Sequence, residues 1–73
     1  MQPIRYKIKL EWTPDAHEVM NGLVDGWLDH EGCCLLPNKD RSDVGSWPLE
    51  QAAAMVGSHQ DDPDLLRATI EAE

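Results

Sequence analysis

The side chains of this chain that could carry out chemistry are few, and the two cysteines come first. Cys33 and Cys34 are the only cysteines among the 73 residues, and His30 lies just before them. A structural zinc ion usually takes four ligands from two separated pairs, so adjacent cysteines are poorly placed to share one ion. Neighbouring residues of a strand also point to opposite faces. We therefore expect packing roles for these three residues and no metal site.

The segment that follows matches a calcium-binding loop only at its start. Asn38, Asp40 and Ser42 have the spacing of the first ligands of such a loop. Asp43 then occupies the position that requires glycine, and Leu49 occupies that of the bidentate glutamate. The pattern predicts no calcium site.

Groupings of residues that would support catalysis are missing from the sequence. It contains no glycine-rich phosphate loop and no defensible combination of nucleophile, base and orienting acid. Cys33 and Cys34 lie in an apolar run without a nearby cation, which raises the pKa of a thiol and makes it inert. We predict a protein with no enzymatic activity, no cofactor and no metal.

The charge of the chain is strongly negative and unevenly distributed. The formal net charge is −8, and after residue 13 thirteen acids face three bases. Such a body repels nucleic acid and favours a protein partner with a basic surface. No apolar run approaches the roughly 20 residues that span a bilayer. Because basic residues also interrupt the N-terminal apolar pattern, we expect no signal peptide, no membrane contact and a cytoplasmic location.

The elements that would position these residues begin with a strand. From Ile4 to Trp12, apolar and charged residues alternate strictly. This period of two predicts a half-buried strand over Ile4–Leu10, packed on a following helix. Its outer face would carry Arg5, Lys7 and Lys9.

A long amphipathic helix is predicted over residues 14–31. Thr13 can cap it, Pro14 suits its first turn, and apolar residues then recur with helical spacing. Opposite the apolar face, an acidic ridge would carry three residues, Glu18, Asp25 and Asp29. Gly22 falls in the middle of this ridge and Gly26 at its margin, at a cost of about 1 kcal/mol each relative to alanine.

The remaining elements complete the expected fold. Cys33–Leu36 suggests a short second strand, and Pro37–Ser46 is rich in turn residues. Ser46-Trp47-Pro48 opens a second helix that ends before Gly57. Asp62-Pro63-Asp64 opens a third helix that continues to the C-terminus. The fold class is therefore predicted as α+β: one small domain over residues 1–73, with an N-terminal strand, a long amphipathic helix, a short second strand and a C-terminal helical hairpin.

The basic face of the first strand has three interpretations. Its lysines can protect an edge strand from aggregation. Its edge can pair with an extended peptide of a partner. The strand followed by a helix, from Ile4 to about Leu28, also resembles the ribbon-helix-helix DNA-binding proteins, which implies a dimeric repressor whose paired strands enter the major groove. The acidity of the chain and the length of the predicted helix depart from that family.

The acidic ridge and its glycines leave two interpretations open. The ridge can be solvated surface, or it can face a partner. Glycines four residues apart on a helix allow another backbone to approach closely, and that backbone can belong to a second element or to a partner.

The small size, the strand Ile4–Trp12 and the acidic remainder together resemble small phage-encoded inhibitors of bacterial RNA polymerase, of the Xanthomonas phage type. The resemblance implies a stoichiometric transcription inhibitor without a cofactor, which binds the β′ subunit of the polymerase in the cytoplasm of the host. Anti-CRISPR proteins and antitoxins share the same general character and remain alternatives.

These observations predict how a partner is held. We expect a monomer whose acidic body meets a basic rim, with the strand Ile4–Leu10 or the first helix supplying the specific contacts. The predicted partner-binding residues are Arg5, Lys7, Lys9, Glu18, Gly22, Asp25, Gly26 and Asp29.

Overall fold

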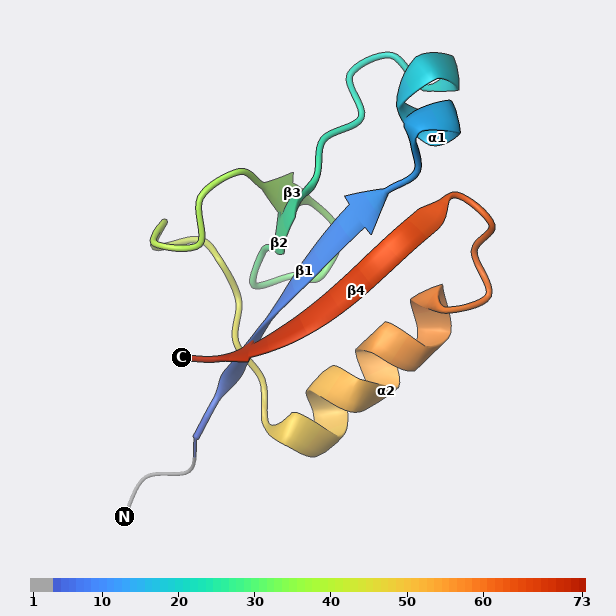
Figure 1. Ribbon diagram of the computed structural model, residues 1–73. Helices are drawn as coiled ribbons and strands as arrows, with labels where there is room; N and C mark the ends of the chain where they lie inside the picture. The colour runs from blue at the N-terminus through green and yellow to red at the C-terminus, as the bar shows by residue number, and fades with distance from the viewer. Residues whose placement is uncertain (1–3) are drawn as a thin grey trace.

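The computed structural model describes residues 4–73, which form a four-stranded antiparallel sheet with one longer helix against it (Figure 1). The strand order is β3-β2-β1-β4. In chain order the elements are β1 (Tyr6–Trp12), α1 (Pro14–Val19), β2 (Gly26–Leu28), β3 (Leu35–Leu36), α2 (Leu49–His59) and β4 (Leu65–Ala72). Within the described residues, neither helix is long and apolar enough to cross a bilayer.

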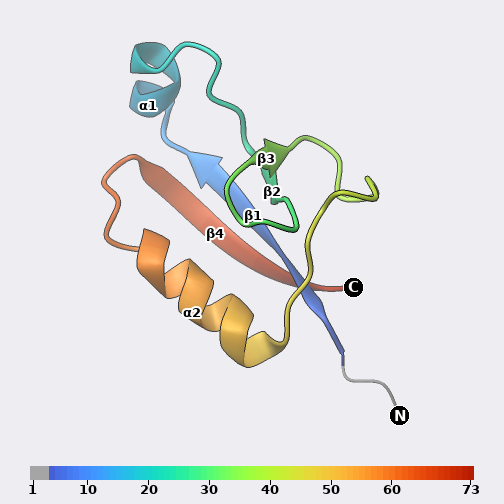
Figure 2. The same cartoon turned by 180° about the vertical axis from the view of Figure 1, so that it is seen from behind.

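Strand β1 lies inside the sheet and is paired along both edges. It pairs with β4 from Tyr6↔Ala72 to Trp12↔Leu65, and with β2 at Lys9↔Trp27 and Leu10↔Gly26. Beyond the end of β2, the backbone of Trp47 exchanges two hydrogen bonds with Tyr6, of 2.8 and 2.9 Å. Figure 2 shows the segment between β3 and α2 passing this half of β1. The predicted N-terminal strand is confirmed over Tyr6–Trp12, whereas Ile4 lies outside it and is exposed.

The core lies between the sheet and α2. Alternation along β1 sends Ile8 and Leu10 to one face of the sheet, where they are 0% and 2% exposed. There they join the other buried members of the core, which are Leu28, Trp47, Ala52 and Val56. Ala52 and Val56 come from α2, which packs on β1 and β4. The prediction that β1 packs on the helix immediately after it is wrong, because the covering helix is α2.

The predicted long helix over residues 14–31 is wrong beyond its first turns. Thr13 caps α1 as expected, since its Oγ1 accepts the N–H of Ala16 at 3.2 Å. The helix ends at Val19, and Gly22 then has a φ of +88°, which a right-handed helix does not contain. The chain turns back and enters the three-residue strand β2 at Gly26. Pairing with β1 therefore overrides the helical spacing of the apolar residues.

The neighbouring strand β3 (Leu35–Leu36) requires a glycine at position 26 of β2. A Cβ at this position would collide with the carbonyl oxygen of Leu36 in the neighbouring strand β3. The close approach of another backbone, one of the two reasons considered for this glycine, is thus confirmed as a contact within the chain. Gly22 has a different reason, because a Cβ there meets nothing within 4 Å and only its positive φ requires glycine.

The predicted C-terminal helical hairpin is also wrong. Its first helix exists as α2, although it ends at His59 and not before Gly57. The Asp62-Pro63-Asp64 segment forms a turn in which Oδ1 of Asp62 accepts the N–H of Asp64 at 2.9 Å. The residues after it form strand β4, which pairs with β1 over its whole length. β-branched Thr69 and Ile70 favour a strand there once β1 offers an edge.

Substitution of Gly26 tests the contact between β2 and β3. We expect Gly26→Ala to lower the free energy of unfolding by about 1–3 kcal/mol, because the two backbones must move apart. Gly57→Ala is the matched control: it lies in α2 with open space around it, and we expect stabilisation by about 0.5–1 kcal/mol. Urea denaturation measures both. Equal stability of Gly26→Ala and the unchanged protein would contradict this packing of β2 on β3.

Candidate functional site

The basic face of β1, predicted to meet a partner, is occupied by contacts within the chain. Arg5 donates from Nε to the Ser46 hydroxyl at 3.0 Å and from a second nitrogen to the Ser46 carbonyl. Lys7 Nζ donates to the carbonyl of Lys39 at 2.8 Å. Lys9 Nζ lies 5.9 Å from the ring centroid of Trp27. These three residues therefore fasten loops and an aromatic ring to the sheet.

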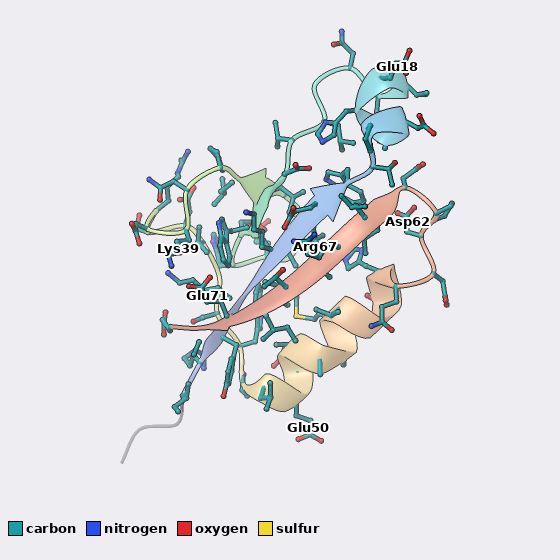
Figure 3. All side chains as sticks on the ribbon, viewed as in Figure 1. Glu18, Lys39, Glu50, Asp62, Arg67 and Glu71 are labelled. Carbon is teal, nitrogen blue, oxygen red and sulfur yellow. The ribbon has the colours of Figure 1, made fainter. Side chains whose placement is uncertain are left out.

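Lys39, in the loop after β3, reaches the same face of the sheet. Its Nζ lies 5.9 Å from the Trp27 centroid and donates to Oε1 of Glu71 in β4 at 2.6 Å. The hydrogen bond and the charge of Glu71 raise the pKa of Lys39. Figure 3 shows Lys39 and Glu71 side by side. Trp27 is therefore covered by two lysines and is 8% exposed.

The predicted acidic ridge does not exist as a single surface, because its three members belong to different segments. Glu18 lies on α1, Asp25 lies in the loop before β2, and Asp29 follows β2. Glu18 is exposed, and no hydrogen bond joins its side chain to the residues described. The other two carboxylates hold loops in place. Gly22 and Gly26, predicted as its neighbours, serve the turn and the β2–β3 contact described above.

Asp25 ties α1 and the following loop to the end of β1. Its Oδ1 accepts the backbone N–H of Trp12 at 2.9 Å and contacts Nε2 of His17 at 2.9 Å. The hydrogen bond from Trp12 has the largest effect and lowers the pKa of Asp25. Desolvation opposes it, and His17 adds to the lowering. The indole N–H of Trp12 also donates to the carbonyl of Val24 at 3.0 Å. Asp25 thus holds a loop in place where a continuous helix was expected.

Asp29 organises the turn between β2 and β3. Its Oδ1 accepts the N–H groups of Cys33 at 3.0 Å and Cys34 at 3.3 Å. Desolvation is the largest single influence on this carboxyl and raises its pKa, but the N–H groups of Cys33, Cys34 and Gly32 together outweigh it, so the pKa is lowered. The turn therefore contains a carboxylate that remains ionised at neutral pH.

The two cysteines lie in this turn and not in a strand. Their Sγ atoms are 3.8 Å apart and both side chains are exposed. A hydrogen bond with Cys34, followed by desolvation and the charges of Asp29 and Glu31, raises the pKa of Cys33 to about 11. A thiol that stays protonated at neutral pH is a poor nucleophile. Ligand atoms of Asp29, Cys33 and Cys34 all lie within 4.8 Å of one another, a grouping that can hold a metal ion.

An apolar hollow of 340 Å³ lies on the core side of the sheet, beside the end of α2. Its apolar lining includes Leu10, Trp12, Leu28 and Leu35, and its polar side chains are those of Cys33 and His59. This volume is at the small end of the range for ligand sites. With no charged side chain in its lining, it suits an apolar side chain or small apolar molecule better than a polar substrate.

The outer edge of β4 is the feature that the sequence interpretation missed. β4 pairs with β1 on one side, and no described residue pairs with its other side. Glu73 donates its N–H to the carbonyl of Arg5 at 2.9 Å. This bond fixes which N–H groups of β4 face β1, because they alternate between the two edges of the strand. The N–H groups of Thr69 and Glu71 then point toward β1, and those of Ala68 and Ile70 point away from it. Apolar Ala68, Ile70 and Ala72 alternate with polar residues, and this period of two was the sequence signal for a strand here.

Comparison with known proteins adds no relative: no family model, no curated protein and no solved structure matches this chain.

Replacing Asp25 tests its role as an anchor. Its pKa lies below the ordinary value of 3.8, so the stabilisation it gives is present above that value and is lost as the pH falls through the lowered pKa. We expect Asp25→Asn to lower stability at pH 7 by less than about 1 kcal/mol, because the side chain is 42% exposed and solvent screens it. Between about pH 5 and pH 2 the variant should lose less further stability than the unchanged protein.

Thermal unfolding across this pH range provides the measurement. Glu18→Gln is the matched control, since Glu18 makes no such contacts and its loss should leave the acid unfolding profile unchanged. If both variants altered that profile equally, Asp25 would not be the anchor described.

Proposed function

We propose that this chain is a non-enzymatic protein-binding module that captures an extended segment of a basic partner along the free edge of β4. The observation that carries the proposal is that β4, the longest strand, is hydrogen-bonded on one side only within the described residues. An exposed edge offers a row of N–H and C=O groups that pair with an added strand. Such an edge is otherwise a liability for aggregation.

The side chains along β4 can add specificity to this backbone pairing. Leu66 is 56% exposed and offers an apolar contact at the start of the strand. Arg67 is exposed on the face opposite the core, where Glu11 is its partner across the ladder. In strand addition, main-chain hydrogen bonds supply affinity and alternate side chains supply selectivity.

The distribution of charge supports a basic partner. The turn that leads into β4 contains Asp61, Asp62 and Asp64. The carbonyl of Asp64 accepts the N–H of Thr13 at 3.0 Å, which holds this turn beside the start of α1. Figure 3 shows Asp62 and Glu18 at this end of β4. Acidic groups around one end of a binding edge accelerate encounter with a basic segment and select against an acidic one.

The identity of the partner rests on the resemblance to small phage inhibitors. We propose a bacterial nucleic-acid-handling machine, with RNA polymerase and its β′ subunit first, and inhibition of transcription as the result. An anti-CRISPR or antitoxin role would use the same edge on a different protein. A DNA-binding repressor of the ribbon-helix-helix type fits less well, because β1 has no free edge for pairing with a second subunit and its basic residues contact the chain itself.

Removing one outward N–H of β4 tests the proposed binding edge. Ala68→Pro removes a donor that points away from β1, a position where an edge strand tolerates proline. We expect a loss of about 1–3 kcal/mol in binding, since a carbonyl of the partner is left unpaired. That corresponds to roughly tenfold or more in affinity. Ala68→Ser keeps the N–H and is the matched control.

The measurement has two stages. The immobilised chain captures partners from a bacterial lysate, and purified RNA polymerase is then assayed for binding and for transcription with each variant, after circular dichroism confirms that the variants are folded. Leu66→Lys provides a second change on the same edge, with Leu49→Lys at the start of α2 as its control. If Ala68→Pro and Leu66→Lys bound the captured partner as tightly as their controls, the β4 edge would not be the binding site.

A further inference from the structure

We propose that the turn Asp29–Cys34 is a binding site for a divalent thiophilic metal ion of the zinc class, held by the Sγ atoms of Cys33 and Cys34 and the carboxylate of Asp29. This site is independent of the β4 edge and of the protein-binding function proposed for it. The ligands come from one short turn between β2 and β3, which β-pairing fixes at both ends.

The spacing of the two sulfur atoms fits a single ion. Zinc binds thiolate sulfur at about 2.3 Å with tetrahedral geometry, which places two ligating sulfurs about 3.8 Å apart. The Sγ atoms of Cys33 and Cys34 are 3.8 Å apart in the metal-free chain. Adjacent cysteines diverge in a strand, but here the strand begins only at Leu35. In the turn, both side chains point to the same side.

Asp29 supplies the third ligand from a position that is already fixed. Its Oδ1 accepts the backbone N–H groups of Cys33 and Cys34. Ligand atoms of all three residues lie within 4.8 Å of one another. A carboxylate whose orientation is set by hydrogen bonds is the arrangement that metal sites use to hold a ligand in place. Three protein ligands leave a fourth position open to water or to a group from a partner.

The charges around the turn favour a cation. Glu31 lies within 3.7 Å of the Cys33 sulfur, and its other carboxylate oxygen lies 3.8 Å from His30 Nε2. A bound divalent ion compensates this negative charge as each thiol releases its proton to solvent. Metal affinity should therefore rise with pH, by up to about tenfold per pH unit for each thiol that must ionise.

Cobalt titration of the full chain, kept reduced, tests this site directly. We expect Co²⁺ to give the near-ultraviolet absorption of cobalt–thiolate bonds at one ion per chain, and Zn²⁺ to displace it. Cys33→Ser and Cys34→Ser should each weaken binding by more than the roughly 10–100-fold that loss of a supporting residue costs. Asp29→Asn, which keeps an oxygen that can accept the two N–H groups, should weaken binding while the melting temperature of the metal-free protein changes little.

His17→Ala, a change on α1 where the ring contacts Asp25, is the control for binding to an unrelated histidine and should leave the cobalt affinity unchanged. The absorption should also weaken as the pH is lowered from 8 toward 6, in keeping with proton release. Absence of cobalt–thiolate absorption at millimolar Co²⁺ would overturn the proposal. Equal cobalt affinity in the unchanged protein and in Cys33→Ser would overturn it as well.

Discussion

The antiparallel pairing of β1 with β4 is the constraint on which the rest of the structure depends. It joins the start of the described chain to its end over seven residue pairs, from Tyr6↔Ala72 to Trp12↔Leu65. This register places Ile8 opposite Ile70 on the face that α2 covers, and so builds the core. The same pairing puts β1 inside the sheet and leaves the outer edge of β4 as the site at which another chain can add a strand.

The parts of the fold that follow from local sequence were predictable, and those that follow from distant pairing were not. Strict alternation over β1 and the proline-led start of α2 each indicate one element without reference to the rest of the chain. The residues after Val19 have helical spacing, yet β1 recruits Gly26–Leu28 as a strand. The C-terminal segment likewise follows a cap-like Asp62-Pro63 signature and becomes β4. In both cases a β-ladder formed between distant residues overrides the local pattern.

The candidate site shows the same division. Lys7 and Lys9 were rightly placed on one face of a strand, and Arg5 lies just before that strand. Their contacts with Ser46, Lys39 and Trp27 come from residues far along the chain. Asp29 was placed on a helical ridge, whereas it caps the turn that gathers the two cysteines. Polar side chains for which the local sequence suggests no structural role can thus hold loops in place through hydrogen bonds. We therefore assign the two proposed binding roles to the backbone edge of β4 and to the cysteine turn.

Amide hydrogen exchange along β4, resolved by residue, tests the central claim most directly. The account predicts slow exchange at Thr69 and Glu71, whose N–H groups point toward β1, and fast exchange at Ala68 and Ile70, whose N–H groups point toward solvent. This alternation should appear in the isolated monomer. Slow exchange at all four residues would show that the outer edge of β4 is already covered, and would contradict both the open edge and the mode of binding proposed from it.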